Sequence, residues 1–361
     1  MSRSGLFEKE NAGTKGRFAP AGLLVLALGC ASTGPSDTGD PPVNDLFPTH
    51  PLSDATGWTY LGFRGGQYPE GSEMPAEHRA AGVNRALSIR PLDANGQPSG
   101  SGKIVMVSIG MSNTTQEFCN PSGNGQCAPG TFVQQALADP AVQRASLVLV
   151  DGAAGGQTAN TWDSPTDANY DRVRDTRLPL WGVTERQVQI AWVKVANAQP
   201  RSALPATDAD AYNLVAGIGS ITRALKARYP NIKLVFLSNR TYGGYATTGL
   251  NPEPYAYESG FGVKWVVGAQ IAQMAGGAPD PRAGDLNYNT VAPWIAWGPD
   301  LWANGEISRP DGLFWVRTDF RDTDGTHPST TGVQKVGTLL LDFLKSSDFS
   351  RCWFVVAGSC S

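Results

Sequence analysis

Four short runs of apolar, often β-branched residues recur along the chain, each bounded by glycine or polar residues. They cover residues 103–109, 145–151, 188–195 and 232–238. Runs of this length that are apolar at nearly every position are typical of strands buried on both faces of a sheet. The pattern therefore predicts four buried strands.

Longer stretches with apolar residues near helical spacing lie between or after these runs, at 208–229, 257–274 and 329–344. The last of them places Val333, Val336 and Leu340 on one stripe. Strands that alternate with helices predict an α/β fold, a three-layer α/β/α arrangement around a central parallel sheet. Sites in such folds form at the carboxyl ends of the strands, so the residues that follow each strand are the candidates for chemistry.

The beginning of the chain has a different pattern, because four basic residues precede an apolar run at 21–28 that ends in Gly29-Cys30. This pattern predicts an export signal, and the run is too short for a permanent membrane span. Its end resembles a bacterial lipobox, so we expect removal of residues 1–29 and lipidation of Cys30. Ordinary signal cleavage nearby, for example after Ala31, is the alternative.

Residues 30–55 are rich in proline, glycine and polar residues and lack periodicity, which predicts a flexible tether. Residues 56–361 are then one domain, with the core motifs at about 100–345. The expected location is outside the cytoplasm of a bacterium, periplasmic or at the cell surface, with the membrane reached through the lipid on Cys30. The role of residues 56–100 and the oligomeric state are not predicted.

The composition is that of a globular protein, with 41% hydrophobic and 17% charged residues, and the net charge of -3 gives no basic footprint for nucleic acid. Four cysteines remain besides Cys30, and an even number in an exported protein favours disulfides. Of the three pairings that four cysteines allow, two local pairs are the simplest. These are Cys119–Cys127 and Cys352–Cys360. A zinc site is disfavoured, since no CxxC pair or nearby histidine supports it.

Ser112 is a candidate nucleophile because it follows the first strand in the segment Gly110-Met111-Ser112-Asn113. A nucleophilic serine needs a tight turn that presents its hydroxyl to a base, and a neighbouring N–H can then bind the oxyanion. A serine that merely caps the following helix is the alternative.

The segment Asp324-Gly325-Thr326-His327 carries the strongest chemical signal, at the turn before the last predicted helix. The carboxylate of Asp324 lies three residues before His327, one of only three histidines, and can hold one ring nitrogen and stabilise the imidazolium. A calcium loop is disfavoured because the glutamate that completes an EF-hand is missing.

With these residues in place, the chain resembles the SGNH (GDSL-like) hydrolase superfamily, nearest to its carbohydrate O-acetylesterase-like branch. The resemblance covers about residues 100–345 and implies a flavodoxin-like fold and ester hydrolysis without metal or cofactor. The first block matches at Gly110 to Asn113, with Met111 where the family has aspartate, and the last block matches at Asp324 to Ser329.

The resemblance implies a catalytic triad of Ser112, His327 and Asp324. It implies an oxyanion hole made by Ser112, by Gly156 of the segment Gly155-Gly156-Gln157-Thr158, and by Asn197 after the third strand. The third block matches poorly, so Lys194 and Asn239 remain alternatives to Asn197.

We therefore expect an exported serine esterase, a carboxylic ester hydrolase that acts on small acyl esters of carbohydrate. The partner is an ester substrate, with an acylated glycan as the expected class. Trp294, Trp297 and Trp302, in a predicted loop region, suggest stacking on sugar rings, and packing into the core is the alternative. The alternative functions are a lipid-directed esterase and a non-catalytic glycan-binding lipoprotein.

Overall fold

The computed structural model describes residues 43–361 of the chain. The predicted signal peptide, Cys30 and the tether up to residue 42 therefore lie outside the described residues. Within residues 43–361, no helix combines the length and the apolar character needed to cross a membrane.

Five parallel strands form the central sheet, in the order β5-β4-β6-β7-β8. Their bounds are β4 Ile104–Gly110, β5 Leu147–Asp151, β6 Val188–Lys194, β7 Leu234–Leu237 and β8 Trp294–Trp297. The first four coincide with the four predicted runs to within two residues. In chain order this is the 2-1-3-4-5 arrangement of flavodoxin-like sheets, so the predicted fold class is confirmed.

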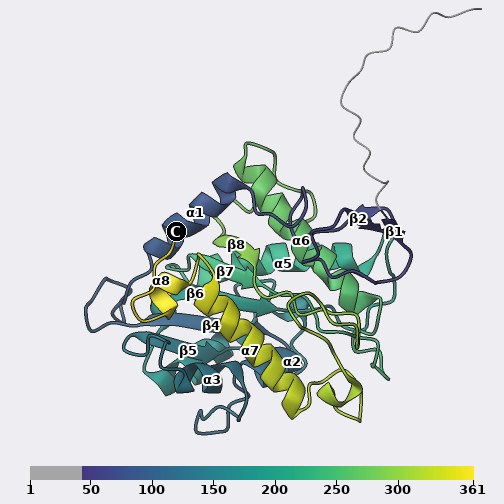
Figure 1. Cartoon of the computed structure of the whole chain (residues 1–361). Helices are drawn as coiled ribbons and strands as arrows, with labels where there is room; N and C mark the ends of the chain where they lie inside the picture. Colours follow the sequence, from purple (N-terminus) through teal and green to yellow (C-terminus); the bar gives the residue numbers. More distant parts are fainter. Residues whose placement is uncertain (1–42) are drawn as a thin grey trace, which may run out of the picture. The chain divides into compact units, whose positions relative to one another are not determined.

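Helices cover both faces of this sheet, which makes three layers (Figure 1). One face packs against α4, α5 and α6, and the other against α1, α2, α3, α7 and α8. The bounds are α1 Ala76–Leu87, α2 Ser112–Phe118, α3 Phe132–Ala138, α4 Ala168–Arg172, α5 Asp210–Arg228, α6 Tyr255–Met274, α7 Thr330–Ser346 and α8 Arg351–Phe354. Shorter helical turns are η1 Ala159–Thr161, η2 Val173–Arg177, η3 Leu178–Trp181, η4 Glu185–Gln187 and η5 Arg317–Asp319.

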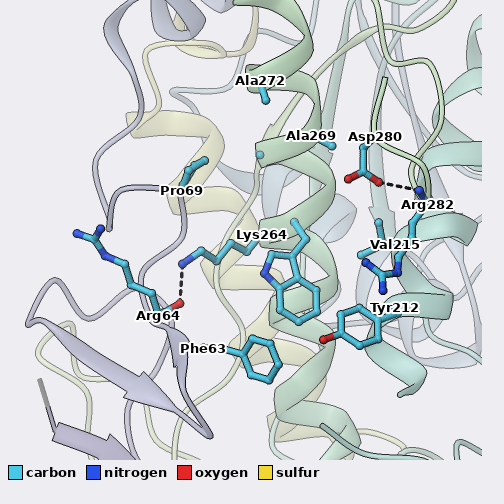
Figure 2. A pocket seen from close by; sticks show the side chains of 12 residues that line it. Phe63, Arg64, Pro69, Tyr212, Val215, Lys264, Ala269, Ala272, Asp280 and Arg282 are labelled. Atoms are coloured by element: carbon cyan, nitrogen blue, oxygen red, sulfur yellow. Dashed lines mark hydrogen bonds between the residues drawn. The ribbon is translucent and has the colours of Figure 1, made fainter. Parts of the chain in front are cut away.

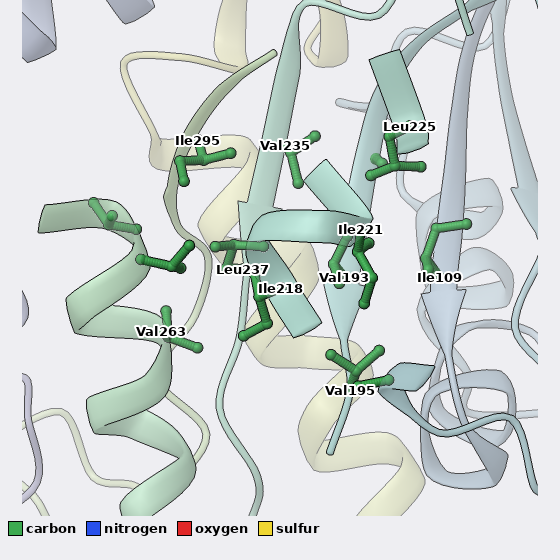
Figure 3. Packing of buried hydrophobic residues seen from close by; sticks show 14 of the residues in the cluster. Ile109, Val193, Val195, Ile218, Ile221, Leu225, Val235, Leu237, Val263 and Ile295 are labelled. Carbon is green, nitrogen blue, oxygen red and sulfur yellow. The ribbon is translucent and has the colours of Figure 1, made fainter. Parts of the chain in front are cut away.

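The alternation of side chains along each strand divides the core between the two faces. In β4, Val105, Val107 and Ile109 face the α5 and α6 layer, whereas Ile104 and Met106 face the α7 layer. Figure 3 shows the first cluster, in which Ile218, Ile221 and Leu225 of α5 pack against valines of β6 and β7. Burying one such side chain stabilises the fold by about 1.5–3 kcal/mol.

The fifth strand was not predicted, because Trp294–Trp297 stands in a sequence region rich in proline and glycine. Trp294, Trp297 and Trp302 are at most 4% exposed. Trp294 donates its indole N–H to the carbonyl oxygen of His78 (3.0 Å), and Trp297 donates to that of Gln67 (2.7 Å). The expectation that these rings stack on sugars is therefore wrong. The segment before β4 supplies the acceptors for Trp294 and Trp297, whereas Trp302 donates its indole N–H to Glu253 (2.8 Å).

Part of the predicted tether is also folded. Val43–Asp45 forms β1, which pairs with β2 (Trp58–Tyr60), and β2 in turn pairs with β3 (Phe63–Arg64). Leu52 is 1% exposed and packs at Gly260, where an added Cβ would lie only 2.3 Å from its Cδ1. The boundary at residue 55 is therefore wrong, because this leucine supplies apolar area to the core.

Both predicted disulfides are present. Cys119 and Cys127 have α-carbons 4.6 Å apart, and those of Cys352 and Cys360 are 5.0 Å apart. The first follows α2, and the second closes the chain end beyond α8. The first disulfide therefore closes the segment that follows the helix of Ser112.

Candidate active site

Three side chains that are far apart in the sequence meet at the carboxyl edge of the sheet. Ser112 is the first residue of α2, directly after β4, and its Oγ lies 2.7 Å from Nε2 of His327. Nδ1 of the same histidine lies 2.8 Å from Oδ2 of Asp324. A hydroxyl, an imidazole and a carboxylate are thus joined in a chain of two hydrogen bonds.

The turn at Ser112 is tight because the residue before Met111 has no side chain. A Cβ at Gly110 would lie 2.2 Å from the carbonyl oxygen of Lys194, which no real structure tolerates. The hydroxyl of Thr114 donates to that same carbonyl oxygen (2.6 Å) and accepts from the N–H of Met111 (3.2 Å). These contacts hold the start of α2 against the end of β6.

The loop before α7 holds the histidine by local hydrogen bonds. Oδ1 of Asp324 accepts the backbone N–H groups of Thr326 (2.8 Å) and His327 (2.7 Å), which leaves Oδ2 for the imidazole. Gly325 adopts φ +64°, and a Cβ there would lie 1.8 Å from the carbonyl oxygen of Tyr245. Only glycine fits this position, because L side chains avoid positive φ and the space is already filled.

The protonation states follow from these contacts. Burial alone would raise the pKa of Asp324, but the hydrogen bonds from the N–H and the ring of His327 and from the N–H of Thr326 outweigh it and lower the pKa. Asp324 is therefore an acceptor at neutral pH, so Nδ1 of His327 carries the proton. Nε2 is then the free acceptor that faces the hydroxyl of Ser112.

Ser112 and His327 open into a cavity of about 230 Å³ that Gly156 and Asn197 also line. An ideal Cβ at Gly155 would lie 4.0 Å from the Cβ of Ser112, so the glycine turn stands beside the serine. The amide of Asn197 donates to Oδ1 of Asp210 (3.0 Å). The structure thus brings together all the residues of the predicted triad and oxyanion hole.

The two alternatives to Asn197 are engaged elsewhere and do not line this cavity. Lys194 is fully buried in an ion pair with Glu117, and burial lowers the pKa of this lysine to about 8. Asn239 donates to Asp300 (2.7 Å) and accepts from the N–H of Leu301 (2.8 Å). Asn197 is therefore the only one of the three that a substrate in the cavity meets.

Asn113, Arg240 and Asn251 are among the polar residues at this cavity to which the sequence analysis assigned no role. Asn113 donates to the carbonyl oxygen of Thr326 (2.9 Å) and so links α2 to the histidine loop. Arg240 and Asn251 line the cavity, and each is nearly fully buried. The position of Arg240 directly after the predicted fourth strand was the available signal, since such positions lie at the carboxyl edge.

A larger cavity of about 540 Å³ lies between α5, α6 and β3. Figure 2 shows Phe63, Tyr212 and Lys264 in its wall. Its charged groups already have partners, since Lys264 donates to the carbonyl oxygen of Arg64 (2.7 Å) and Asp280 accepts the N–H of Arg282 (2.8 Å). None of the triad residues lines it, so the nucleophile and base belong to the smaller cavity.

No protein-family model and no curated protein matches the chain. Solved structures do match, and they include a protein of Bacillus subtilis (13% identity, TM-score 0.35, 69% of this chain and 57% of that chain). Another is a family 2 carbohydrate esterase with a carbohydrate-binding domain from Myceliophthora fergusii (12%, 0.37, 68% and 66%). A third is an extracellular lipase of Streptomyces rimosus (15%, 0.32, 67% and 98%).

The chain spans less than two thirds of the length of the first two of these structures. The matches include esterases and a lipase, the kinds of enzyme that the resemblance named. Identities and TM-scores of this size carry no activity from one protein to another.

Proposed function

We propose that this protein is a serine esterase with Ser112 as nucleophile, His327 as base and Asp324 as the residue that orients the histidine. The observation that carries this proposal is the pair of hydrogen bonds at 2.7 and 2.8 Å that joins the three side chains at the rim of a cavity. A merely structural serine at a helix start has no need of a base that is itself oriented by a carboxylate.

In the proposed reaction, Oγ of Ser112 attacks the acyl carbon while Nε2 of His327 takes its proton. The imidazolium that forms is stabilised by Asp324 and then gives the proton to the departing alcohol as the ester C–O bond breaks. Water activated by the same nitrogen attacks the acyl-enzyme, which releases the acid and restores Ser112. Each step needs only these side chains and water.

The oxyanion of the tetrahedral intermediate is assigned to three donors. The N–H of Ser112 belongs to the first turn of α2, where helical N–H groups have no partner within the helix. The N–H of Gly156 and the amide of Asn197 are the other two, and both residues line the cavity. The amide of Asn197 donates to Oδ1 of Asp210 (3.0 Å) and, over a longer distance, to the backbone carbonyl oxygen of Asp210 (3.4 Å). The N–H of the longer contact is the one proposed to turn to the oxyanion.

The proposed acyl group is small, similar to acetyl. The cavity of about 230 Å³ is smaller than the roughly 300–1,000 Å³ typical of sites for drug-sized ligands. The proposed alcohol is a carbohydrate. The Gly110–Asn113 block supports it, whereas the buried tryptophans no longer do.

We also propose export and lipidation at Cys30, which the first 30 residues support. Two disulfides in residues 43–361 agree with an oxidising compartment. Labelling with a radioactive fatty acid tests this, with Cys30→Ala as the variant that loses the label. A label that persists in this variant contradicts the assignment.

The esterase proposal is tested with the purified protein on 4-nitrophenyl acetate, butyrate and octanoate. We expect kcat/KM to be highest for acetate. A maximum at octanoate would favour a lipid ester substrate. Absence of turnover on all three and on acetylated oligosaccharides would overturn the proposal in favour of a glycan-binding protein.

A further inference from the structure

Arg240 is a buried cation at the wall of the catalytic cavity, and two nitrogen atoms of its guanidinium have no hydrogen-bond partner. The residue follows β7, is 3% exposed and lines the cavity. Its Nε and Nη1 atoms are buried and have no hydrogen-bond partner. A guanidinium has five N–H donors, and burying such donors without an acceptor is energetically unfavourable.

The carboxylates nearest in electrostatic terms, Glu117 and Glu253, are occupied by other donors. Glu117 binds the ammonium of Lys194. Glu253 accepts the N–H of Gly243 (2.8 Å) and the indole N–H of Trp302 (2.8 Å). Both carboxylates oppose the burial that lowers the pKa of Arg240, but neither is hydrogen-bonded to it.

The other buried cations of residues 43–361 have direct partners, unlike Nε and Nη1 of Arg240. Arg309, whose side chain is 7% exposed, forms ion pairs with Asp300 and Asp311. Lys194 is paired with Glu117. A buried charge without a partner is costly, and a carboxylate that enters the cavity would remove that cost.

A second unsatisfied group in the same cavity points to hydroxyls on the ligand. Asn251 is 6% exposed, and its Nδ2 donates to the carbonyl oxygen of Asn197 (3.0 Å), which fixes the orientation of the amide. Its Oδ1 is then a buried acceptor without a donor. The residues that line this cavity with Ser112 therefore include one cation with unpaired donors and one amide with an unpaired acceptor.

We propose that the ester substrate is an acylated acidic sugar, whose carboxylate binds Arg240 and whose hydroxyl donates to Oδ1 of Asn251. This inference rests on the proposed esterase function and names the class of its alcohol. Arg240 is the only lysine or arginine in the cavity lining, so it balances one carboxylate rather than a phosphate dianion.

The position of Arg240 fits this substrate. Ser112 follows β4 and Arg240 follows β7, with β6 between them. Two strand spacings separate the residues by about 10 Å along the sheet edge. One sugar ring with an acyl ester on one side and a carboxylate on the other spans such a distance.

The test compares kcat/KM for three acetyl esters of one ring: a methyl glucuronoside, its uncharged glucuronamide and the methyl glucoside. We expect the glucuronoside to exceed the amide by about tenfold or more, since a hydrogen bond to a charged group is stronger than one between neutral groups. Equal values for the acid and the amide would overturn the inference and leave the esterase assignment intact. A preference for 4-nitrophenyl hemisuccinate over butyrate without one for the glucuronoside would also overturn it, because the anion would then belong to the acyl group.

Variants test whether Arg240 causes the preference for the acid over the amide. Arg240→Gln should bring the acid-to-amide ratio close to one, and Arg240→Lys should retain part of it. Arg282→Gln, at the larger cavity, is the matched control and should keep the parental ratio. A parental ratio in Arg240→Gln would overturn the inference.

A separate measurement does not depend on the variants or on turnover. If Arg240→Gln does not fold, the inhibition of the parent enzyme by free glucuronate is compared with its inhibition by glucuronamide. Equal inhibition by the two compounds overturns the inference. If the parent hydrolyses no ester, the proposed function fails, and calorimetry with both ligands decides the inference by itself. Tighter binding of the glucuronate would uphold the recognition by Arg240, and equal or absent binding would refute it.

Discussion

Asn113 joins the two halves of the catalytic site through its hydrogen bond to the carbonyl oxygen of Thr326, at 2.9 Å. The donor stands next to Ser112 on α2, and the acceptor stands next to His327. Asn113 is 3% exposed, so water does not replace this bond when it is lost. The relationship gives the asparagine of the Gly-x-Ser-Asn segment a positioning role.

Asn113→Ala should therefore lower kcat more than it changes KM, because Ser112 and His327 are then no longer held in a fixed position relative to each other. The free energy of unfolding should fall by about 1–3 kcal/mol, the cost of a buried unsatisfied group. Steady-state kinetics on 4-nitrophenyl acetate and urea melts measure both, with the exposed Asn95→Ala as control. A parental kcat in Asn113→Ala would contradict the role.

Ser112→Ala should abolish ester hydrolysis, and Asp324→Asn should leave weak activity. The serine forms the covalent bond, whereas the aspartate sets the tautomer of His327, and its loss in a comparable triad costs on the order of 10⁴ in rate. Both side chains stand at a cavity rim, so thermal melts should stay near the parental curve. Ser122→Ala, an exposed serine, is the control. Parental turnover by Ser112→Ala would refute the nucleophile.

Gly325→Ala should destabilise the histidine loop. The position has φ +64°, and the added methyl group would meet the carbonyl oxygen of Tyr245 at 1.8 Å. The free energy of unfolding should fall by at least about 2 kcal/mol, and activity should fall with it. Gly123→Ala, where a Cβ meets nothing within 4 Å, should stay near the parental value in the same melts. Equal stability of the two variants would show that the loop adjusts at little cost.

Asp151 should make stability depend on pH. Burial raises the pKa of Asp151 to about 6, despite hydrogen bonds from the hydroxyls of Ser108 and Thr115 (2.6 Å each). The unfolded value is about 3.9, so the folded state binds the proton more tightly. The stability from this group is then fully present below about pH 4 and is lost as the pH rises through about 6.

The measurement compares urea melts of the parent and Asp151→Asn at a series of pH values. The difference in free energy of unfolding, parent minus variant, should fall by about 2.4 kcal/mol between pH 4 and pH 8. The exposed Asp322→Asn is the control for the loss of one carboxylate. A flat difference for Asp151→Asn would mean that its pKa is not raised.

The disulfide at Cys119 and Cys127 should stabilise the segment after α2. Replacing both cysteines by serine should lower the free energy of unfolding by about 2–3 kcal/mol, as the chain-entropy model gives for a short loop. Non-reducing peptide mapping of the parent should find both local pairs. Free thiols, or a bridge from Cys119 or Cys127 to the C-terminal pair, would contradict the structure.

Several features could be predicted because they depend on residues close together in the sequence. The four strands are continuous apolar runs, and each disulfide joins cysteines eight residues apart. The hydrogen bond from His327 to Asp324 spans three residues within one turn. The resemblance to SGNH hydrolases then predicted that Ser112 would stand opposite this pair, and the parallel sheet brings them to the same edge.

Other features were decided only by the tertiary structure, because they depend on which distant residues fill the space around a side chain. Trp294 is in a strand because β7 pairs with β8, and its indole N–H is accepted by the backbone carbonyl oxygen of His78. Leu52 belongs to the core rather than to a tether because α6 leaves room for it at Gly260. Both are non-local packing outcomes that no local pattern encodes.

The same reason separates Arg240 from Lys194, two cations that follow or end neighbouring strands and that the sequence does not distinguish. Folding places Glu117 against Lys194 and leaves Nε and Nη1 of Arg240 without a hydrogen-bond partner at the candidate catalytic cavity. By itself the sequence predicted the candidate nucleophile, the candidate base and the sheet that joins them, from local pattern, chain order and the resemblance. Which cation is free to meet a substrate was decided by the tertiary structure, because a charge is neutralised by whatever the fold packs against it.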